Sequence, residues 1–335
     1  MNRTLYHRLA LVAALFAFGV VVLGAYVRLS DAGLGCPDWP GCYGRLIVSE
    51  AAHHVATANA SWPERPFEAH KAWKEMLHRY AAGTLGILIL ALAVLAWRGR
   101  AAIGQPLRLP LFLVALVVFQ ALLGMWTVTL LLKPLVVMLH LLGGMATLAL
   151  LWLLALRTAP WLPVPRVPVS TGLRRFALVA LAVLVLQLAL GGWTSSNYAA
   201  LACPDFPTCQ NSWWPEADFR EAFVLWRGIG VDYEGGVLEH PARVAIHFTH
   251  RLGALLTLAL VGMLCLALFK RGDGALRSAA TVTGLLLIAQ VALGISTVSF
   301  ARPLGIAVAH NGVAALLVLA LVTLTYLLYR SPRGG

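Results

Sequence analysis

Eight long apolar stretches, separated by polar connections, constrain the fold of this chain most strongly. Each is about 20 residues long, which is the length that an α-helix needs to cross the hydrocarbon core of a bilayer. Of the 335 residues, 60% are hydrophobic and only 12% are charged, a composition that excludes a soluble globular protein. The sequence therefore predicts an all-α polytopic membrane protein with eight transmembrane helices. The predicted helices span residues 9–29, 76–97, 110–131, 135–156, 174–195, 244–269, 279–300 and 304–328.

The basic residues between these stretches predict the orientation of the chain. The termini and connections on one side carry fourteen basic residues and one acidic residue, Asp273. The other side carries twelve basic and thirteen acidic residues, mostly in two long loops. Loops rich in Lys and Arg stay in the cytoplasm, so we expect both termini there. The basic residues lie between the apolar stretches and do not form a patch on a soluble domain. This distribution indicates membrane topology and argues against nucleic-acid binding.

The chain contains an internal repeat. The loop sequence Cys-Pro-Asp-Trp-Pro-Gly-Cys at 36–42 returns as Cys-Pro-Asp-Phe-Pro-Thr-Cys at 203–209, and Gln120 and Gln290 each begin a Gln-x-x-x-Gly motif. We therefore expect two pseudo-symmetric four-helix bundles. Because each copy has four spans, the two copies have the same orientation, which makes this a parallel repeat. The predicted divisions are an N-terminal half (1–157), a Pro-rich cytoplasmic linker (158–173) and a C-terminal half (174–335).

Four histidines fall at matched places in the predicted spans, all at one depth: His78, His140, His250 and His310. Each half holds one from its second helix and one from its fourth. Two imidazoles that face each other across a helical bundle are typical axial ligands of haem iron. The predicted ligand pairs are His78/His140 and His250/His310. Helix-to-helix hydrogen bonds and a di-metal site remain alternative interpretations of these residues.

Ionisable residues cluster beside the first histidine of each pair. The motif Glu75-Met-Leu-His78-Arg79 has a near copy in His247-Phe-Thr-His250-Arg251. Ionisable groups in membrane helices are energetically expensive and therefore candidates for function. Arg79 and Arg251 are candidates for pairing with haem propionates. The change from Glu75 to His247 suggests that one site reacts and the other carries electrons.

The four loop cysteines form two C-x5-C pairs on the predicted extracytoplasmic side, where disulfides persist. Cys203 and Cys209 favour a structural disulfide, whereas Cys36 and Cys42 are equally compatible with a structural and a redox-active one. A four-cysteine zinc site is a further alternative, although C-x5-C is not the usual zinc spacing. We expect the remaining histidines outside the predicted spans to be solvated: His7, His53, His54, His70 and His240.

As a set, these motifs resemble the haem A synthase family over almost the whole chain. The resemblance is carried by the two cysteine loops, Glu-x-x-His-Arg at 75–79, His-Leu-Leu-Gly-Gly at 140–144, His-Arg-Leu-Gly at 250–253 and His310-Asn-Gly. It implies an oxidoreductase that converts a methyl group of haem O to a formyl group. It implies a haem b cofactor on His250 and His310, substrate haem between His78 and His140, Glu75 as catalytic carboxylate and Cys36/Cys42 as functional cysteines.

This assignment is chemically coherent. Oxidation of the methyl group leaves a cationic carbon beside the macrocycle, and a carboxylate at Glu75 can stabilise that charge or accept the proton. Water is the expected source of oxygen, and the electrons would leave through haem b. We expect an integral protein of the bacterial cytoplasmic membrane, in contact with lipid, with its haem sites and cysteine loops on the extracytoplasmic side. Expected partners are haem O synthase, a thiol–disulfide reductant and a quinone-type electron acceptor.

Two other functions fit parts of the pattern. A di-haem membrane cytochrome that relays electrons, for example to thiols, would have two equivalent haem sites and would not require Glu75. A haem carrier or transporter without catalysis would need helices broken in mid-membrane, and the spans show no paired internal prolines.

Overall fold

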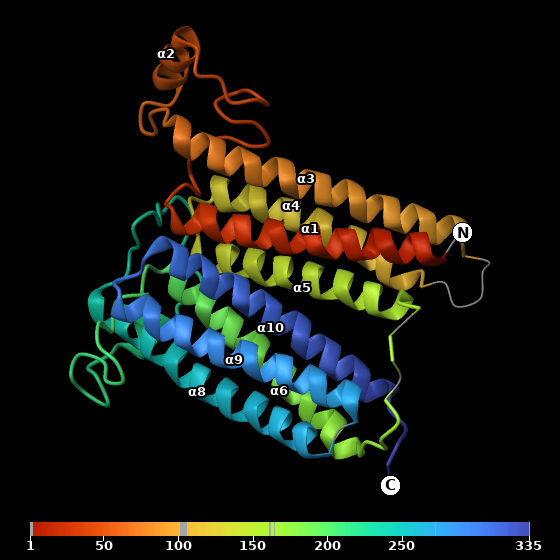
Figure 1. Ribbon diagram of the computed structural model, residues 1–335. Helices are drawn as coiled ribbons and strands as arrows, with labels where there is room; N and C mark the ends of the chain where they lie inside the picture. Colours follow the sequence, from red (N-terminus) through yellow and green to blue (C-terminus); the bar gives the residue numbers. More distant parts are fainter. Residues whose placement is uncertain (1–2, 101–105, 161, 164, 272, 335) are drawn as a thin grey trace.

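The computed structural model describes residues 3–100, 106–160, 162–163, 165–271 and 273–334. Within these residues the protein is all-helical and has no β-strand beyond isolated bridges (Figure 1). Eight of the described helices are long and apolar enough to cross a membrane, which confirms the predicted fold class. They are α1 (Arg3–Leu29), α3 (Ala69–Arg98), α4 (Arg108–Thr129), α5 (Pro134–Thr158), α6 (Thr171–Ser196), α8 (His240–Arg271), α9 (Gly274–Ser299) and α10 (Leu304–Arg330).

The helices extend beyond the apolar stretches that predict them. Helix α3 begins at Ala69, so the motif that starts at Glu75 lies nearly two turns inside the helix and does not open it. The prediction was wrong because it counted apolar residues only. Residues 69–74 include three polar side chains, those of His70, Lys71 and Lys74, but none of the six residues breaks a helix. Helix α8 likewise starts at His240, with Pro241 in its first turn, where a missing N–H group costs nothing.

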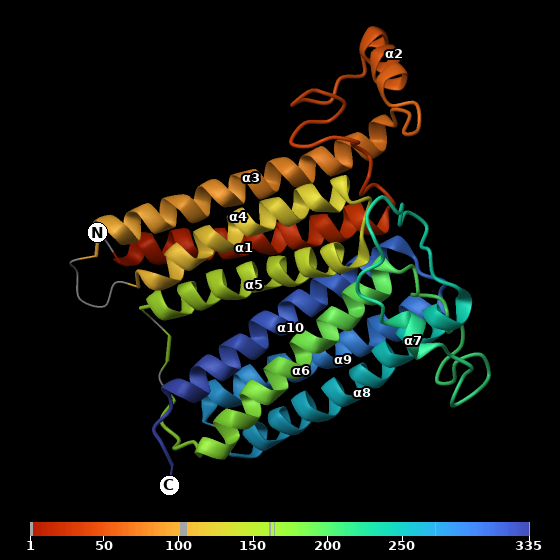
Figure 2. The same cartoon turned by 180° about the vertical axis from the view of Figure 1, so that it is seen from behind.

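Two short helices in the long loops were not predicted: α2 (Ala52–Ser61) and α7 (Phe219–Ala222). Neither carries the apolar periodicity from which helices are recognised in a sequence. Helix α2 stands away from the bundle, beyond the end of α3 (Figures 1 and 2).

The long helices pack in two rings. Helix α1 contacts α3 and α5, and α4 contacts the same two helices. In the second ring, α6 and α9 each contact both α8 and α10. The rings meet where α1 and α5 contact α10 and where α5 contacts α6 (Figure 2). The two termini lie at one end of the bundle, and the two long loops lie at the other, which we call the loop end (Figure 1).

A continuous core joins these helices. It includes Leu148, Leu151 and Leu154 of α5, whose side chains are fully buried, and small residues of α1 such as Ala10 and Ala13. Small residues allow helices to approach closely where lipid gives no hydrophobic drive for association. The large apolar side chains that face outward have the exposure expected of a lipid-facing surface.

Two contacts lie at the end of the bundle opposite the loop end. The first differs from the prediction made from the sequence, and the second was not predicted. His7 is buried, not solvated, and its Nδ1 lies 3.1 Å from the carbonyl oxygen of Ala155. The linker 158–173 includes residues 161 and 164, which lie outside the described residues. Its described end is held by the C-terminus, because Val169 N–H donates to Pro332 O at 3.0 Å.

Candidate functional site

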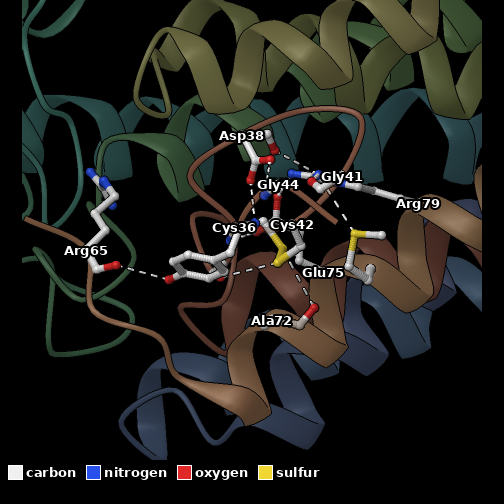
Figure 3. The surroundings of a disulfide bond; sticks show 12 residues. Cys36, Asp38, Gly41, Cys42, Gly44, Arg65, Ala72, Glu75 and Arg79 are labelled. Carbon is white, nitrogen blue, oxygen red and sulfur yellow. Dashed lines mark hydrogen bonds and ion pairs between the residues drawn. A yellow bond between two sulfur atoms is a disulfide. The ribbon is translucent and has the colours of Figure 1, made fainter. Parts of the chain in front are cut away.

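Residues 36–45 form a closed loop, here called the first hairpin, at the loop end of α3 (Figure 3). A disulfide joins Cys36 to Cys42, with a Cα–Cα distance of 4.8 Å. The carboxylate of Asp38 accepts the N–H groups of Tyr43 at 2.6 Å and Gly44 at 2.8 Å. Gly44 has a φ of +75°, a conformation that glycine adopts without steric strain. The residue types at 38 and 44 therefore follow from the closed turn.

Glu75 and Arg79 fasten the first hairpin to α3 (Figure 3). Glu75 is buried, and its Oε2 accepts the N–H of Cys36 at 2.9 Å. Its Oε1 pairs with Nη2 of Arg79 at 2.5 Å. Arg79 also donates to the carbonyl oxygens of Asp38, at 2.9 Å, and Gly41. A carboxylate with a guanidinium partner and a main-chain donor is held in one orientation.

Residues 203–212 form the second hairpin at the loop end of α8, and it repeats this construction. A disulfide joins Cys203 to Cys209, with a Cα–Cα distance of 4.6 Å. The carboxylate of Asp205 accepts the N–H groups of Gln210 at 2.6 Å and Asn211 at 3.0 Å, and the hydroxyl of Thr208. The Thr208 hydroxyl and these main-chain donors lower the pKa of Asp205 below its ordinary value.

His247 replaces the carboxylate in the second half. Its Nδ1 accepts the N–H of Cys203 at 3.2 Å. Arg251 donates to the carbonyl oxygens of Thr208 at 2.7 Å and Cys203 at 2.8 Å, as Arg79 does in the first half. Because Nδ1 is an acceptor it carries no proton, so His247 is not an imidazolium ion. The halves therefore share a hairpin attachment but differ in charge at its centre.

Each of the four predicted haem ligands lies against a glycine of a neighbouring helix. A Cβ added to that glycine would meet the imidazole at 2.8 Å for Gly24, at 3.1 to 3.2 Å for Gly294 and Gly191, and at 3.4 Å for Gly124, so the first three contacts are tighter than usual and the fourth is ordinary. The absence of a side chain therefore defines where each ring lies. The four ring–glycine pairs are His78 with Gly24, His140 with Gly124, His250 with Gly191, and His310 with Gly294.

Within each half the two histidines come near each other. His140 lies close to His78, and His250 lies close to His310. Nδ1 of His78 and of His310 is buried and has no hydrogen-bond partner among the described residues. Buried polar atoms without partners are rare and require an explanation. A haem iron held by the two histidines of a half would give unpartnered imidazoles a ligand, so the residues fit a haem in each half.

Glutamines lie one turn before three of the four glycines, and no role was predicted for them. Nε2 of Gln187 lies 3.1 Å from Nδ1 of His250 and donates to the His250 carbonyl at 3.0 Å. Nε2 of Gln290 lies 3.3 Å from Nε2 of His310. The residue one turn before Gly24, which contacts His78, is Val20. The Gln-x-x-x-Gly motif was visible in the sequence and could have drawn attention to these glutamines. Only the packing of the helices shows that the motif lies against an imidazole.

Other polar contacts at the loop end join segments distant in the sequence. Arg65, beyond the first hairpin, pairs with Asp232 at 2.8 Å and Glu234 at 3.1 Å in the loop between α6 and α8. Arg28, at the end of α1, donates to Ser195 O at 2.9 Å and to the Tyr198 hydroxyl at 3.2 Å. These contacts connect the loop ends of the two rings of helices.

Two metal sites that the sequence left open as alternatives lack the ligands they would need. A four-cysteine zinc site is wrong for this structure, because both pairs are disulfides and offer no thiolate. In the described ranges, no three His, Cys, Asp or Glu side chains converge on one point, so a di-metal site has no ligand set. The guanidinium groups of Arg79 and Arg251 bind hairpin carbonyls, and their pairing with propionates stays a prediction.

Comparison with known proteins identifies the family to which the chain belongs. The family model described as cytochrome oxidase assembly protein matches residues 7–322. A haem A synthase of Shewanella oneidensis is 48% identical over 95% of both chains. A haem A synthase of Caulobacter vibrioides is 30% identical over 92% of this chain and 91% of its own, and one of Halalkalibacterium halodurans is 27% identical over 98% and 99%. The chain therefore belongs to the haem A synthase family of oxidoreductases.

Proposed function

We propose that this protein is a haem A synthase that oxidises a methyl group of haem O to a formyl group through an alcohol. The methyl group and one water give the alcohol, two protons and two electrons. Oxidation of the alcohol to the aldehyde releases two more protons and two more electrons. Membership of the family and the names of its curated relatives support the overall conversion. The unequal pair Glu75 and His247 supports a division into one reacting site and one electron-carrying site.

We assign the substrate haem to the first half, between His78 and His140, and haem b to the second half, between His250 and His310. When bound, haem b supplies a one-electron carrier through which the electrons leave. The assignment is supported by the amide of Gln187 beside His250, because a histidine that binds a resident metal usually has a hydrogen-bond partner at its other ring nitrogen. It is supported also by Val20, which leaves His78 without an equivalent polar partner from α1.

Glu75 has the features required of the catalytic carboxylate. It lies one turn before His78 on the same helix, and residues three apart share a helix face. The Cys36 N–H and Arg79 fix its orientation. A fixed negative charge near the reacting methyl group stabilises the positive charge that develops during oxidation, and the same group can accept the released proton.

The Cys36–Cys42 disulfide contributes to catalysis by holding the hairpin that orients Glu75. Both cysteines are buried, so a partner thiol could reach the sulfurs only if the hairpin opened. This burial favours a positioning role over a redox-active one. Exchange with a thiol–disulfide reductant would then serve to form or repair the hairpin, not to carry electrons in each turnover.

The orientation of the protein follows from its charges. The disulfides lie in the two long loops, the four histidines lie in the first half of helices that begin at the loop end, and the basic connections lie at the opposite end. We place the loop end on the extracytoplasmic side of the bacterial cytoplasmic membrane. Delivery of substrate by haem O synthase and removal of electrons by a quinone-type acceptor complete the proposed cycle.

The experiment that tests this proposal analyses the haems bound to purified wild-type protein and to Glu75→Gln, by pyridine haemochrome assay and chromatography of the extract. Glu75→Gln keeps an acceptor for the Cys36 N–H but removes the charge. The proposal expects haem b with haem A or the alcohol in the wild type, and haem b with haem O in the variant. Haem b alone in both, even with haem O supplied, would favour the electron-relay cytochrome.

A further inference from the structure

Both hairpins are followed directly by two large apolar side chains that the protein leaves exposed. After the first hairpin come Leu46 and Ile47, each with a relative exposure of 69%, and after the second come Trp213 and Trp214, with 75% and 70%. The two pairs occupy the same place in the repeat, four and five residues after the second cysteine. Two adjacent exposed apolar residues in both copies indicate a shared environment, since isolated exposed apolar residues are common but repeated patches are not.

The first pair lies at the level of the lipid-facing surface of α3. The hydroxyl of Tyr80, eleven residues into α3, donates to the carbonyl oxygen of Leu46. Around this level α3 exposes Leu77, at 50%, and further along it exposes Ile87 and Leu90. Because a helix rises about 1.5 Å per residue, Tyr80 is roughly 16 Å from the start of α3. The apolar pair is thus beside the membrane-spanning part of the helix, not above it.

The second pair lies beside α8 in the same way. The ring of Trp214 meets the ring of Phe248 edge to face, with 5.2 Å between centroids. Phe248 is followed on α8 by Leu252 and Leu255, which are exposed. The loop that contains the second hairpin extends sideways from the loop end of α8, as the loop that contains the first hairpin does from α3 (Figure 1).

We propose that these two pairs, 46–47 and 213–214, insert into the interfacial layer of the bilayer and anchor the hairpins to lipid. The apolar surface of each pair continues the lipid-facing surface of the adjacent helix. The pairs share apolarity but not shape, which a bilayer accepts and a specific protein interface does not. Tryptophan is also enriched at membrane–water interfaces, where its ring is apolar and its N–H remains hydrated. This inference does not depend on the haem assignments.

The test uses the full chain in lipid vesicles, with nitroxide labels on single cysteines in a Cys265→Ala background. Ile47→Cys and Trp213→Cys are the test sites. Ala60→Cys, exposed on the polar helix α2, is the aqueous control, and Leu90→Cys is the lipid control. Titration of one thiol per denatured, non-reduced chain verifies that both disulfides remain. Collision with oxygen, which partitions into lipid, and with a water-soluble nickel chelate is then measured.

We expect the oxygen-to-nickel collision ratio at 47 and 213 to exceed that at 60 several-fold and to approach that at 90. Ratios equal to that at 60 would overturn the proposal, as would low collision with both reagents, which would indicate a covering protein.

A second measurement avoids new cysteines. Quenching of tryptophan fluorescence by brominated lipids is expected to fall in W213F/W214F. It should stay unchanged in W193F, whose ring is buried. Equal quenching in the wild type and W213F/W214F would contradict lipid contact.

Discussion

Glu75 and His247 perform the same structural task with different charges. Each accepts the N–H of the first cysteine of its hairpin, Glu75 from Cys36 at 2.9 Å and His247 from Cys203 at 3.2 Å. In each half an arginine four residues later donates to carbonyl oxygens of the hairpin. Attachment of the hairpin therefore does not require a carboxylate. The negative charge of Glu75 is left for another role, which we assign to the reaction.

The exchange Glu75→His separates these two roles. The imidazole can accept the Cys36 N–H, as His247 does in the other half, so the hairpin and its disulfide should remain. Conversion of haem O should fall at least about 100-fold, because a positioned acid–base group contributes this much or more. Turnover in membranes and thiol titration measure the two outcomes. Wild-type turnover in Glu75→His would show that the charge is not needed.

The glycine contacts predict that Gly191→Ala lowers retention of haem b. Its Cβ would lie 3.2 Å from Cε1 of His250, so the ring would have to move from its position. Gly262→Ala, on α8, is the matched control, because beyond the adjacent backbone of α8 no described atom lies within 4 Å of its Cβ. Haem content per chain and the low-spin absorption spectrum measure the effect. Equal haem retention in both variants would contradict the role assigned to this contact.

The amide of Gln187 predicts a difference in ligand strength between the halves. In the described structure Oε1 of Gln187 is buried without a partner, and a half-turn of the amide would offer it to the Nδ1–H of an iron-bound His250. Gln187→Val should weaken haem b binding by about 10- to 100-fold, the usual effect of removing the hydrogen-bond partner of a metal ligand. Val20→Gln should make substrate haem harder to remove from the first half. Haem dissociation rates to an acceptor protein test both, and unchanged rates would refute the asymmetry.

The second hairpin should respond to acid through Asp205. Its pKa is lowered by the Thr208 hydroxyl and two main-chain donors, so the ionised carboxylate stabilises the folded hairpin. That stabilisation is complete above the ordinary pKa of 3.8 and is lost as the pH falls through the lower folded-state pKa. Hydrogen exchange in 203–214 should therefore be faster in Asp205→Ala than in wild type at neutral pH, and the difference should vanish in strong acid. Exchange in 36–47 is the internal control.

Much of this protein is determined by local sequence. Eight apolar stretches of membrane-spanning length specify eight helices, because a backbone in lipid must satisfy its own hydrogen bonds. The Cys-Pro-Asp motifs identify two closed loops, and the matched histidines identify candidate haem ligands. The positions at which the helices begin were predicted less accurately. His70, Lys71 and Lys74 interrupt the apolar pattern before residue 75, yet residues 69–74 belong to α3 because hydrogen bonds propagate along an existing helix at little cost.

Other features exist only in the tertiary structure. Nothing in the sequence brings Glu75 to the N–H of Cys36, thirty-nine residues earlier, or His247 to that of Cys203. The burial of His7 against α5 and the contact of each histidine with one glycine depend on which helix faces meet. The sequence by itself determined the helices, the repeat and the residue types, because these follow from local composition and spacing. The packing of helices decided which polar groups meet, because such contacts depend on the rotation and depth of helices far apart in the chain.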